Sequence, residues 1–287
     1  AYIHSVLVQE RRGMLRVWNL SLLVATFSLT ILGTFLTRSG VVNSVHAFSQ
    51  SAIGPWLLTF FAAIVIVSVG LIGWRGDRLH SPGSIDSPLS REGAFLANNV
   101  LFAVFAFVVL LGTVFPLVVE ALQSRTIVVG EPFFDRLTIP IGITMLTIMA
   151  IAPVLPWRKA SQELLSKRLF WPAWCGVLAL AGSVWVGATG LAPLLTFALG
   201  GFASGSALRQ VVLATRRQGL RGLVGRANGG MIVHLGVIII AVALAASNSF
   251  THSQELNLEV GKVATFSGHT FELVDVIEEK TDRATAV

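Results

Sequence analysis

Two histidines in this sequence lie inside apolar stretches rather than in the polar segments between them. His4 comes six residues before Glu10, and His234 comes eight residues after Arg226. Because an α-helix rises 1.5 Å per residue, the two imidazoles would lie about 9 Å and about 12 Å from the same face of a membrane. Their helices would run in opposite directions, so the sequence predicts two imidazoles at similar depth.

Imidazole is a common protein ligand of iron. Two imidazoles with no carboxylate nearby suit a six-coordinate haem iron better than zinc, which requires a third and a fourth ligand. Gly229 and Gly230 would let a bulky group approach the helix that carries His234. The alternative is that each histidine only hydrogen-bonds a neighbouring helix, and for either residue alone this alternative is favoured. For the pair, the sequence leaves both interpretations open.

A second group of chemically capable side chains lies in the segment 37–51. Arg38 stands at a membrane boundary, and His46 lies on a short amphipathic stretch. The guanidinium could bind a porphyrin propionate, and the imidazole could bind its iron. The alternative is an interfacial helix with a snorkelling arginine and a solvated histidine. Composition does not choose between the two.

The composition indicates what kind of protein must position these side chains. Of the 287 residues, 54% are hydrophobic and 13% are charged, whereas a soluble domain carries about 25% charged residues. This excludes a cytosolic enzyme. Cys175 is the single cysteine, which excludes a disulfide framework, a CxxC redox pair and a cysteine zinc site.

Seven stretches approach the roughly 20 apolar residues that cross a bilayer, and residues 1–9 resemble the end of an eighth helix. None of the seven contains Asp, Glu, Lys or Arg, which argues against proton relay and ion coupling. The sequence thus predicts an all-α polytopic membrane protein. The predicted spans are 18–36, 53–72, 94–119, 139–155, 171–188, 191–207 and 229–246.

The basic residues predict the orientation of this bundle. Alternate connections carry 15 of the 21 Lys and Arg residues, whereas the remaining connections carry only Arg38, Arg125 and Arg136. Since positively charged loops stay in the cytoplasm, the segments 38–51 and 120–136 and the C-terminal tail should lie outside. The basic loops lack interleaved aromatic residues, so nucleic-acid binding is not predicted.

The segment 247–287 differs from the preceding bundle, 1–246. It has three basic and seven acidic residues, a net charge of −4. Apolar residues alternate over 256–260, Gly261 and Lys262 form a turn, and a second strand-like run covers 271–277. We expect the start of a small periplasmic β module that the sequence leaves incomplete.

Several runs of residues resemble the CcmF family of cytochrome c-type biogenesis proteins, the haem lyases of System I cytochrome c maturation. They occur in order along nearly the whole chain. They are Ile-His-Ser at 3–5, Gly-Thr-Phe-Leu-Thr-Arg-Ser-Gly at 33–40, Ser-Val-His-Ala-Phe at 44–48, Ser-Arg-Glu-Gly at 90–93 leading to Asn98-Asn99, Gly-Thr-Val-Phe-Pro at 112–116 and Met-Ile-Val-His-Leu-Gly at 231–236.

The resemblance implies a multi-pass protein of the bacterial inner membrane that joins haem covalently to the CxxCH motif of apocytochrome c on the periplasmic side. Its partners would be a membrane-tethered haem chaperone and a thioreductase subunit that holds the apocytochrome. By motif, His4 and His234 would hold a permanent b-type haem. His46 matches the second of two outer histidines and would be the exchangeable axial ligand of incoming haem, with Arg38 near a propionate.

The sequence departs from the family at its N-terminal side. The tryptophan-rich segment and the first outer histidine lie upstream of the position of His4 in that family, and this sequence does not contain them. We therefore expect a portion of a longer protein, or one product of a split gene, that does not form thioethers alone. Two other functions stay open: a haem transporter or carrier without covalent chemistry, and a structural subunit of a respiratory membrane complex.

Overall fold

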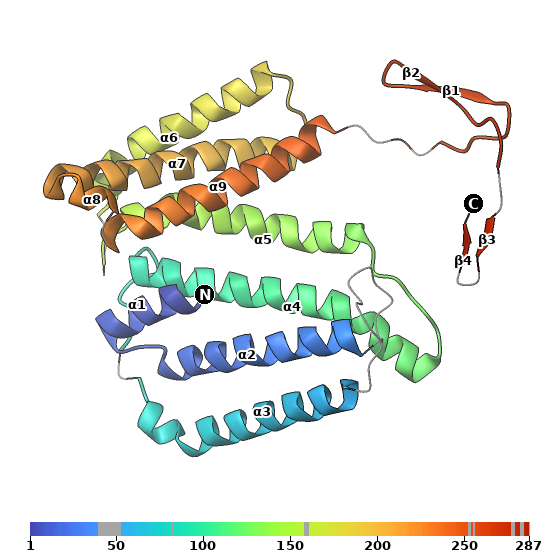
Figure 1. The fold of residues 1–287 in the computed structure, drawn as a ribbon. Coiled ribbons are helices and arrows are strands. Elements are labelled where there is room, and N and C mark those ends of the chain that lie inside the picture. The colour runs from blue at the N-terminus through green and yellow to red at the C-terminus, as the bar shows by residue number, and fades with distance from the viewer. Residues whose placement is uncertain are drawn as a thin grey trace.

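The computed structural model describes residues 1–39, 53–81, 83–157, 161–224, 226–251, 254, 256–276, 279–281 and 284–286. Most of these residues are helical, and short β hairpins follow near the C-terminus (Figure 1). The elements in chain order are α1 (Tyr2–Arg12), α2 (Arg16–Arg38), α3 (Gly54–Trp74), η1 (Gly76–Leu79), α4 (Arg91–Gln123), α5 (Glu131–Ile151), η2 (Ala152–Val154), α6 (Gln162–Trp185), α7 (Leu191–Gln218), α8 (Arg221–Val224), α9 (Arg226–Phe250), β1 (Val263–Phe266), β2 (His269–Glu272), β3 (Glu279–Thr281) and β4 (Ala284–Ala286).

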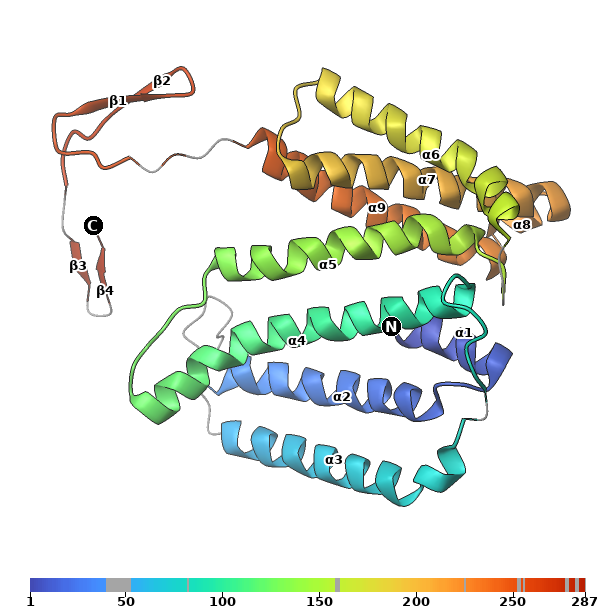
Figure 2. The ribbon, with the colours of Figure 1, turned by 180° about the vertical axis from the view of Figure 1, so that it is seen from behind.

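The long helices lie side by side, as the two opposite views show (Figures 1 and 2). Helices α4 and α5 occupy the middle and pack on each other. Helices α1, α2 and α3 lie on the α4 side, whereas α6, α7 and α9 lie on the α5 side. The chain therefore forms two groups of helices that meet at α4 and α5.

Six helices within the described residues are long and apolar enough to cross a membrane: α2, α3, α4, α5 extended through η2, α7 and α9. The chain is therefore a multi-pass membrane protein. The predicted span 171–188 lies on α6, which is a helix of 24 residues but is not among these six. The count of seven spans is therefore not confirmed.

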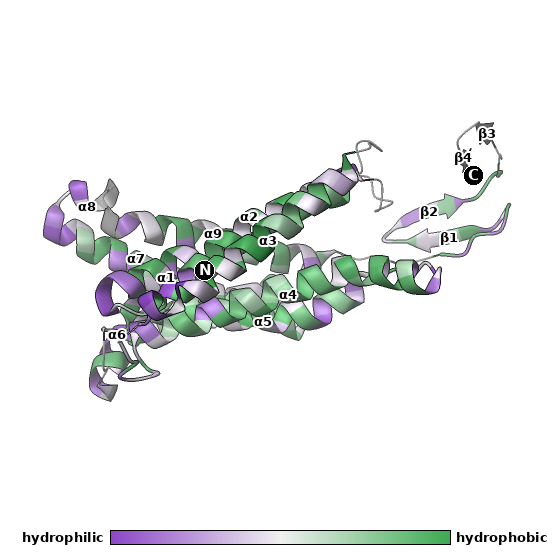
Figure 3. Ribbon diagram, turned by 90° about the horizontal axis from the view of Figure 1, so that it is seen from below, coloured by the Kyte–Doolittle hydropathy of each residue, from purple (hydrophilic) through white to green (hydrophobic). Residues whose placement is uncertain are grey.

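Apolar side chains cover the middle of the bundle, and polar residues gather at its ends. Figure 3 shows hydrophobic residues along the helices and hydrophilic residues at the end where α1 and α8 lie. Ile66, Val69 and Trp74 of α3 are all more than half exposed. In water such a surface would be costly, whereas in lipid it is the expected outer face of a bundle.

Helices α5, α7 and α9 are held together by apolar packing. Leu146, Ala150, Ala203 and Ile238 form their buried cluster. Helix α7 also lies close to α6, because a Cβ atom at Gly201 would be only 2.5 Å from Ala179 Cβ and 2.6 Å from a backbone oxygen of α6. Small residues allow helices in lipid to approach in this way.

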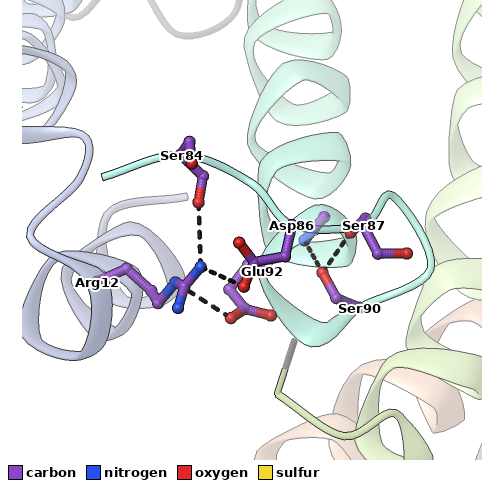
Figure 4. A network of polar contacts seen from close by, with 7 residues as sticks. Arg12, Ser84, Asp86, Ser87, Ser90 and Glu92 are labelled. Carbon is purple, nitrogen blue, oxygen red and sulfur yellow. Dashed lines mark hydrogen bonds and ion pairs between the residues drawn. The ribbon is translucent and has the colours of Figure 1, made fainter. Parts of the chain in front are cut away.

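Polar contacts instead join α1 to the segment before α4 (Figure 4). Arg12 Nη2 donates to Asp86 Oδ2 over 2.7 Å and to the Ser84 carbonyl over 3.1 Å. Arg12 Nε lies 3.5 Å from a carboxylate oxygen of Glu92, whose side chain is only 3% exposed. Ser90 caps α4 by accepting a hydrogen bond from the Gly93 backbone N–H.

Within the described residues of the tail, β1 pairs with β2 and β3 pairs with β4, both antiparallel. The prediction of β structure is correct, but the predicted position of the first strand, 256–260, is wrong, because the described residues there form no strand. The hairpin turn lies instead at Ser267 and Gly268, whose φ angles are 49° and 81°. Positive φ at both central residues suits a tight hairpin turn, so this pair sets the register and moves β1 later in the chain.

Candidate functional site

The structure brings His4 of α1 and His234 of α9 together. Their ring centroids are 6.0 Å apart, and their ring planes are inclined at 79°. The residues come from opposite ends of the sequence and from the two groups of helices described above. Both side chains are half-buried. The pair therefore bridges the two sides of the bundle at one point.

Helix α4 fixes the ring of His4 in two ways. The Phe95 ring stacks on it with a centroid distance of 4.9 Å and an interplanar angle of 4°. The side-chain Nδ2 of Asn98 lies 2.9 Å from His4 Nδ1. Phe95 and Asn98 are three residues apart, so they share one face of the helix. Stacking fixes the plane of the imidazole, and the amide contact fixes its rotation within that plane.

His234 is held differently. Its Nδ1 atom is buried and has no hydrogen-bond partner within the part of the chain that the structure describes. A buried polar atom without a partner costs free energy unless another group satisfies it. Its neighbours Ile232 and Val233 are exposed apolar residues of the same helix. The described residues thus fix the ring of His4 through its Nδ1 atom but do not fix the ring of His234 in this way.

The geometry and the donor set of the pair can be compared with what a bound metal group requires. Two imidazoles on opposite sides of one metal have ring centroids about 6 Å apart, since each bond is about 2 Å long and each ring centre lies about 1 Å further out. The observed 6.0 Å matches this spacing. No group of three or more His, Cys, Asp or Glu side chains that could hold a metal ion occurs among the described residues. Two imidazoles without a carboxylate or thiolate beside them suit a haem iron, which His4 and His234 would hold, better than a tetrahedral zinc ion.

Aromatic and basic side chains extend from this site toward the basic end of the bundle. Trp157 lies edge-on to Phe95, with ring centroids 6.1 Å apart. The guanidinium carbons of Arg11 and Arg91 lie 5.8 Å and 5.6 Å from the centroid of the Trp157 ring. The imidazole of His4 is therefore linked through two aromatic rings to two cations.

The other predicted site residues lie elsewhere. Arg38 is the last residue of α2 and is exposed. His46 falls within 40–52, outside the described residues. The predicted role of the segment 37–51 therefore stays a prediction.

Sequence reasoning did not single out Phe95, Asn98 or Trp157 as site residues. One signal could have revealed Asn98. Two adjacent amides, Asn98 and Asn99, stand in a span that otherwise consists almost wholly of apolar residues, and polar groups at membrane depth are costly enough to require a partner. No comparable signal marks Phe95 among the many phenylalanines of the chain.

No protein-family model matches the chain. The chain is 33% identical over 286 residues to the cytochrome c-type biogenesis protein CycK of Bradyrhizobium diazoefficiens, covering 95% of this chain and 43% of the relative. It is 36% identical over 280 residues to CycK of Rhizobium meliloti, covering 92% and 40%. It is 33% identical over 277 residues to CcmF of Pseudomonas aeruginosa, covering 94% and 42%.

A solved structure, cytochrome c heme lyase CcmF, is also similar. The TM-score is 0.67 and the sequence identity is 30%, and the match covers 91% of this chain and 40% of the other. The chain therefore spans about two fifths of the length of the proteins it matches. The matches cover 91% to 95% of this chain, so the similarity extends over both groups of helices.

Proposed function

This chain belongs to the CcmF/CycK family of cytochrome c-type biogenesis proteins, and on that premise we propose that it is the membrane part of a haem lyase that holds a b-type haem between His4 and His234. The observation that carries the proposal is the 6.0 Å spacing of two imidazoles from helices at opposite ends of the chain. When bound, such a haem supplies a one-electron redox centre that can keep incoming haem iron reduced.

The residues of the chain would contribute ligation and a dry environment. The two imidazoles would hold the iron in the inner half of the bilayer, where the apolar helices exclude water. Phe95 and Asn98 would keep His4 in one orientation before the cofactor arrives, which reduces the ordering cost of binding.

The covalent step would take place on the periplasmic side. There the thiol of an apocytochrome CxxCH motif adds across a haem vinyl group: a sulfur–carbon bond forms, the hydrogen goes to the adjacent vinyl carbon, and no net oxidant is needed. His46 would hold the incoming iron until the histidine of the cytochrome replaces it, and Arg38 would contact a propionate. Because the reacting thiols belong to the substrate, the chain needs no cysteine for this step.

The partners would be a membrane-tethered haem chaperone that delivers haem and a thioreductase subunit that presents the apocytochrome. The chain would lie in a bacterial inner membrane with its basic loops in the cytoplasm and with the tail from residue 247 in the periplasm. The partition of basic residues supports this orientation. Arg12 ends α1, Arg75 follows α3, Arg91 begins α4 and Arg216 lies in the last turn of α7, and these helix ends lie at the same end of the bundle (Figure 1).

A reduced-minus-oxidised absorption spectrum of the purified protein tests the proposal. We expect a b-type signal at about one haem per chain, lost in both His4→Ala and His234→Ala. The matched control is His80→Ala, because His80 is exposed in the loop between α3 and α4. An unmodified protein without stoichiometric haem would contradict the proposal and favour a structural subunit.

The outer segment needs a separate experiment in the complete lyase. We expect His46→Ala to retain the b-type spectrum but to abolish maturation of cytochrome c. Normal maturation in that variant would remove the role assigned to His46. Haem release without any thioether product in the unmodified lyase would instead indicate a carrier.

A further inference from the structure

We propose that Asn98 is a positioning residue for His4: its side-chain oxygen accepts the Nδ1 hydrogen of the imidazole and thereby leaves Nε2 free to bind iron. The inference rests on the proposed haem site and assigns a role to a residue outside the pair of ligands. Asn98 touches the ligand rather than the iron, so it acts through His4.

The placement of Asn98 supports the assignment. Its amide is 2.9 Å from His4 Nδ1 and its side chain is 8% exposed, so water scarcely competes for the contact. The stacked Phe95 ring keeps the imidazole plane aligned with the amide. Helix α4 itself is anchored by the Ser90 cap and by the contact of Glu92 with Arg12. The amide therefore meets one ring nitrogen from a rigid helix.

The chemistry of imidazole makes this contact decisive for ligation. A neutral imidazole carries a hydrogen on one nitrogen and a lone pair on the other. When the Asn98 Nδ2 group donates, Nδ1 uses its lone pair and Nε2 keeps the hydrogen. A half-turn of the amide brings Oδ1 to the same place; Nδ1–H then donates and the Nε2 lone pair becomes available for a metal. Metal-bound histidines generally donate their second N–H to such an acceptor, which also strengthens the ligand.

The two ligands differ in this respect. His234 Nδ1 has no hydrogen-bond partner among the residues that the structure describes, whereas His4 Nδ1 has one. An imidazole that donates to an acceptor gives more electron density to the metal. We therefore expect His4 to be the stronger ligand and the Asn98 contact to lower the reduction potential of the haem.

The test measures haem affinity and reduction potential in detergent-solubilised full-length protein. Asn98→Leu removes the acceptor and keeps the branched shape of the side chain; we expect the haem affinity to fall by about tenfold to a hundredfold and the potential of the remaining haem to rise. Asn98→Asp keeps an acceptor and adds charge, so the haem should stay bound and its potential should fall. If Asn98 had only a structural role, the reduction potential would not rise in Asn98→Leu and fall in Asn98→Asp.

Asn99→Leu is the matched control, since Asn99 is an adjacent, fully buried amide of the same helix. It should leave the potential close to that of the unmodified protein. The assignment of Asn98 would be overturned if Asn99→Leu changed the haem affinity and the potential as much as Asn98→Leu, or if Asn98→Leu changed neither. In either case, loss of haem in His4→Ala would still support the haem site. An unmodified protein without haem would overturn both.

Discussion

The two sides of the bundle use different interactions to position their helices. On the α1 side, the contacts are polar and directional: Arg12 with Asp86 and Glu92, and Asn98 with His4. On the α9 side, helices α6, α7 and α9 approach closely through glycines and a small apolar cluster, and the side-chain hydrogen bonds of α9 among the described residues lie near its two ends, at Asn228 and Ser249. Packing brings helices close but tolerates some sliding, whereas hydrogen bonds and ion pairs fix the position along the helix axis.

The difference matters most for α1, which has 11 residues and is the shortest of the helices that carry a site residue. Isolated helices of that length are marginal even in favourable sequences. The ion pairs of Arg12 and the ring contacts of His4 supply the stability that such a short helix lacks. The short helix therefore depends on polar anchoring, whereas the 25-residue α9 packs along its length and makes its polar contact to Thr189 at its last turn.

The largest expected effect comes from Arg12→Met. This change leaves the buried carboxylate of Glu92 less compensated, and breaking a buried ion pair costs about 3 kcal/mol or more. Denaturant titration in detergent micelles measures the loss of unfolding free energy. Lys167→Met is the control, because Lys167 and Glu163 are largely exposed and such pairs contribute less than about 1 kcal/mol. Similar losses in both variants would show that the α1 side is not specially anchored.

Gly201→Val tests the packed side. The added atoms would meet Ala179 and the backbone of Cys175, and overpacking of this kind costs about 2 kcal/mol. The same titration measures it, with Gly182→Val on α6 as the control, because nothing lies within 4 Å of a Cβ atom there. If Gly182→Val destabilised the protein as much, β-branching in a helix rather than close packing would explain the loss.

The smallest effect compares two helix caps. Ser90 is 1% exposed; it accepts from the Gly93 N–H over 3.1 Å and donates to the Ser87 carbonyl over 2.6 Å. Ser161 caps α6 over a longer 3.3 Å contact and is exposed. We expect Ser90→Ala to cost about 1 kcal/mol and Ser161→Ala about half of that. A larger loss of unfolding free energy in Ser161→Ala than in Ser90→Ala would contradict the expectation that the α4 cap stabilises the protein more than the α6 cap.

Hydropathy predicted where helices cross the membrane but not where they begin and end. The span predicted over 139–155 corresponds to α5, Glu131–Ile151, whose start follows Gly130 and includes Pro132 at its first turn. The span predicted over 94–119 corresponds to α4, which begins three residues earlier at the Ser90 cap. The length of an apolar stretch indicates which residues cross the lipid, whereas capping residues and prolines determine where the helix begins and ends.

The candidate site could be predicted only in part for a related reason. The depth of a residue in the membrane follows from its position along the helix, and this reasoning predicted similar depths for His4 and His234. The direction in which a side chain points around the helix axis depends on tertiary packing, and therefore the contacts of His4 with Phe95 and Asn98 could not be predicted. The structure also leaves His46 among the residues it does not describe, so the outer half of the site still depends on the motif.

The anchoring of Arg12 has a consequence for the far end of its helix. His4 and Arg12 are eight residues apart on α1, a separation of about 12 Å. One residue inserted between them would raise the imidazole by about 1.5 Å and turn it by about 100° away from α9. The ion pairs of Arg12 at the C-terminal end of α1 therefore set both the height and the rotation of the imidazole of His4, about two turns away.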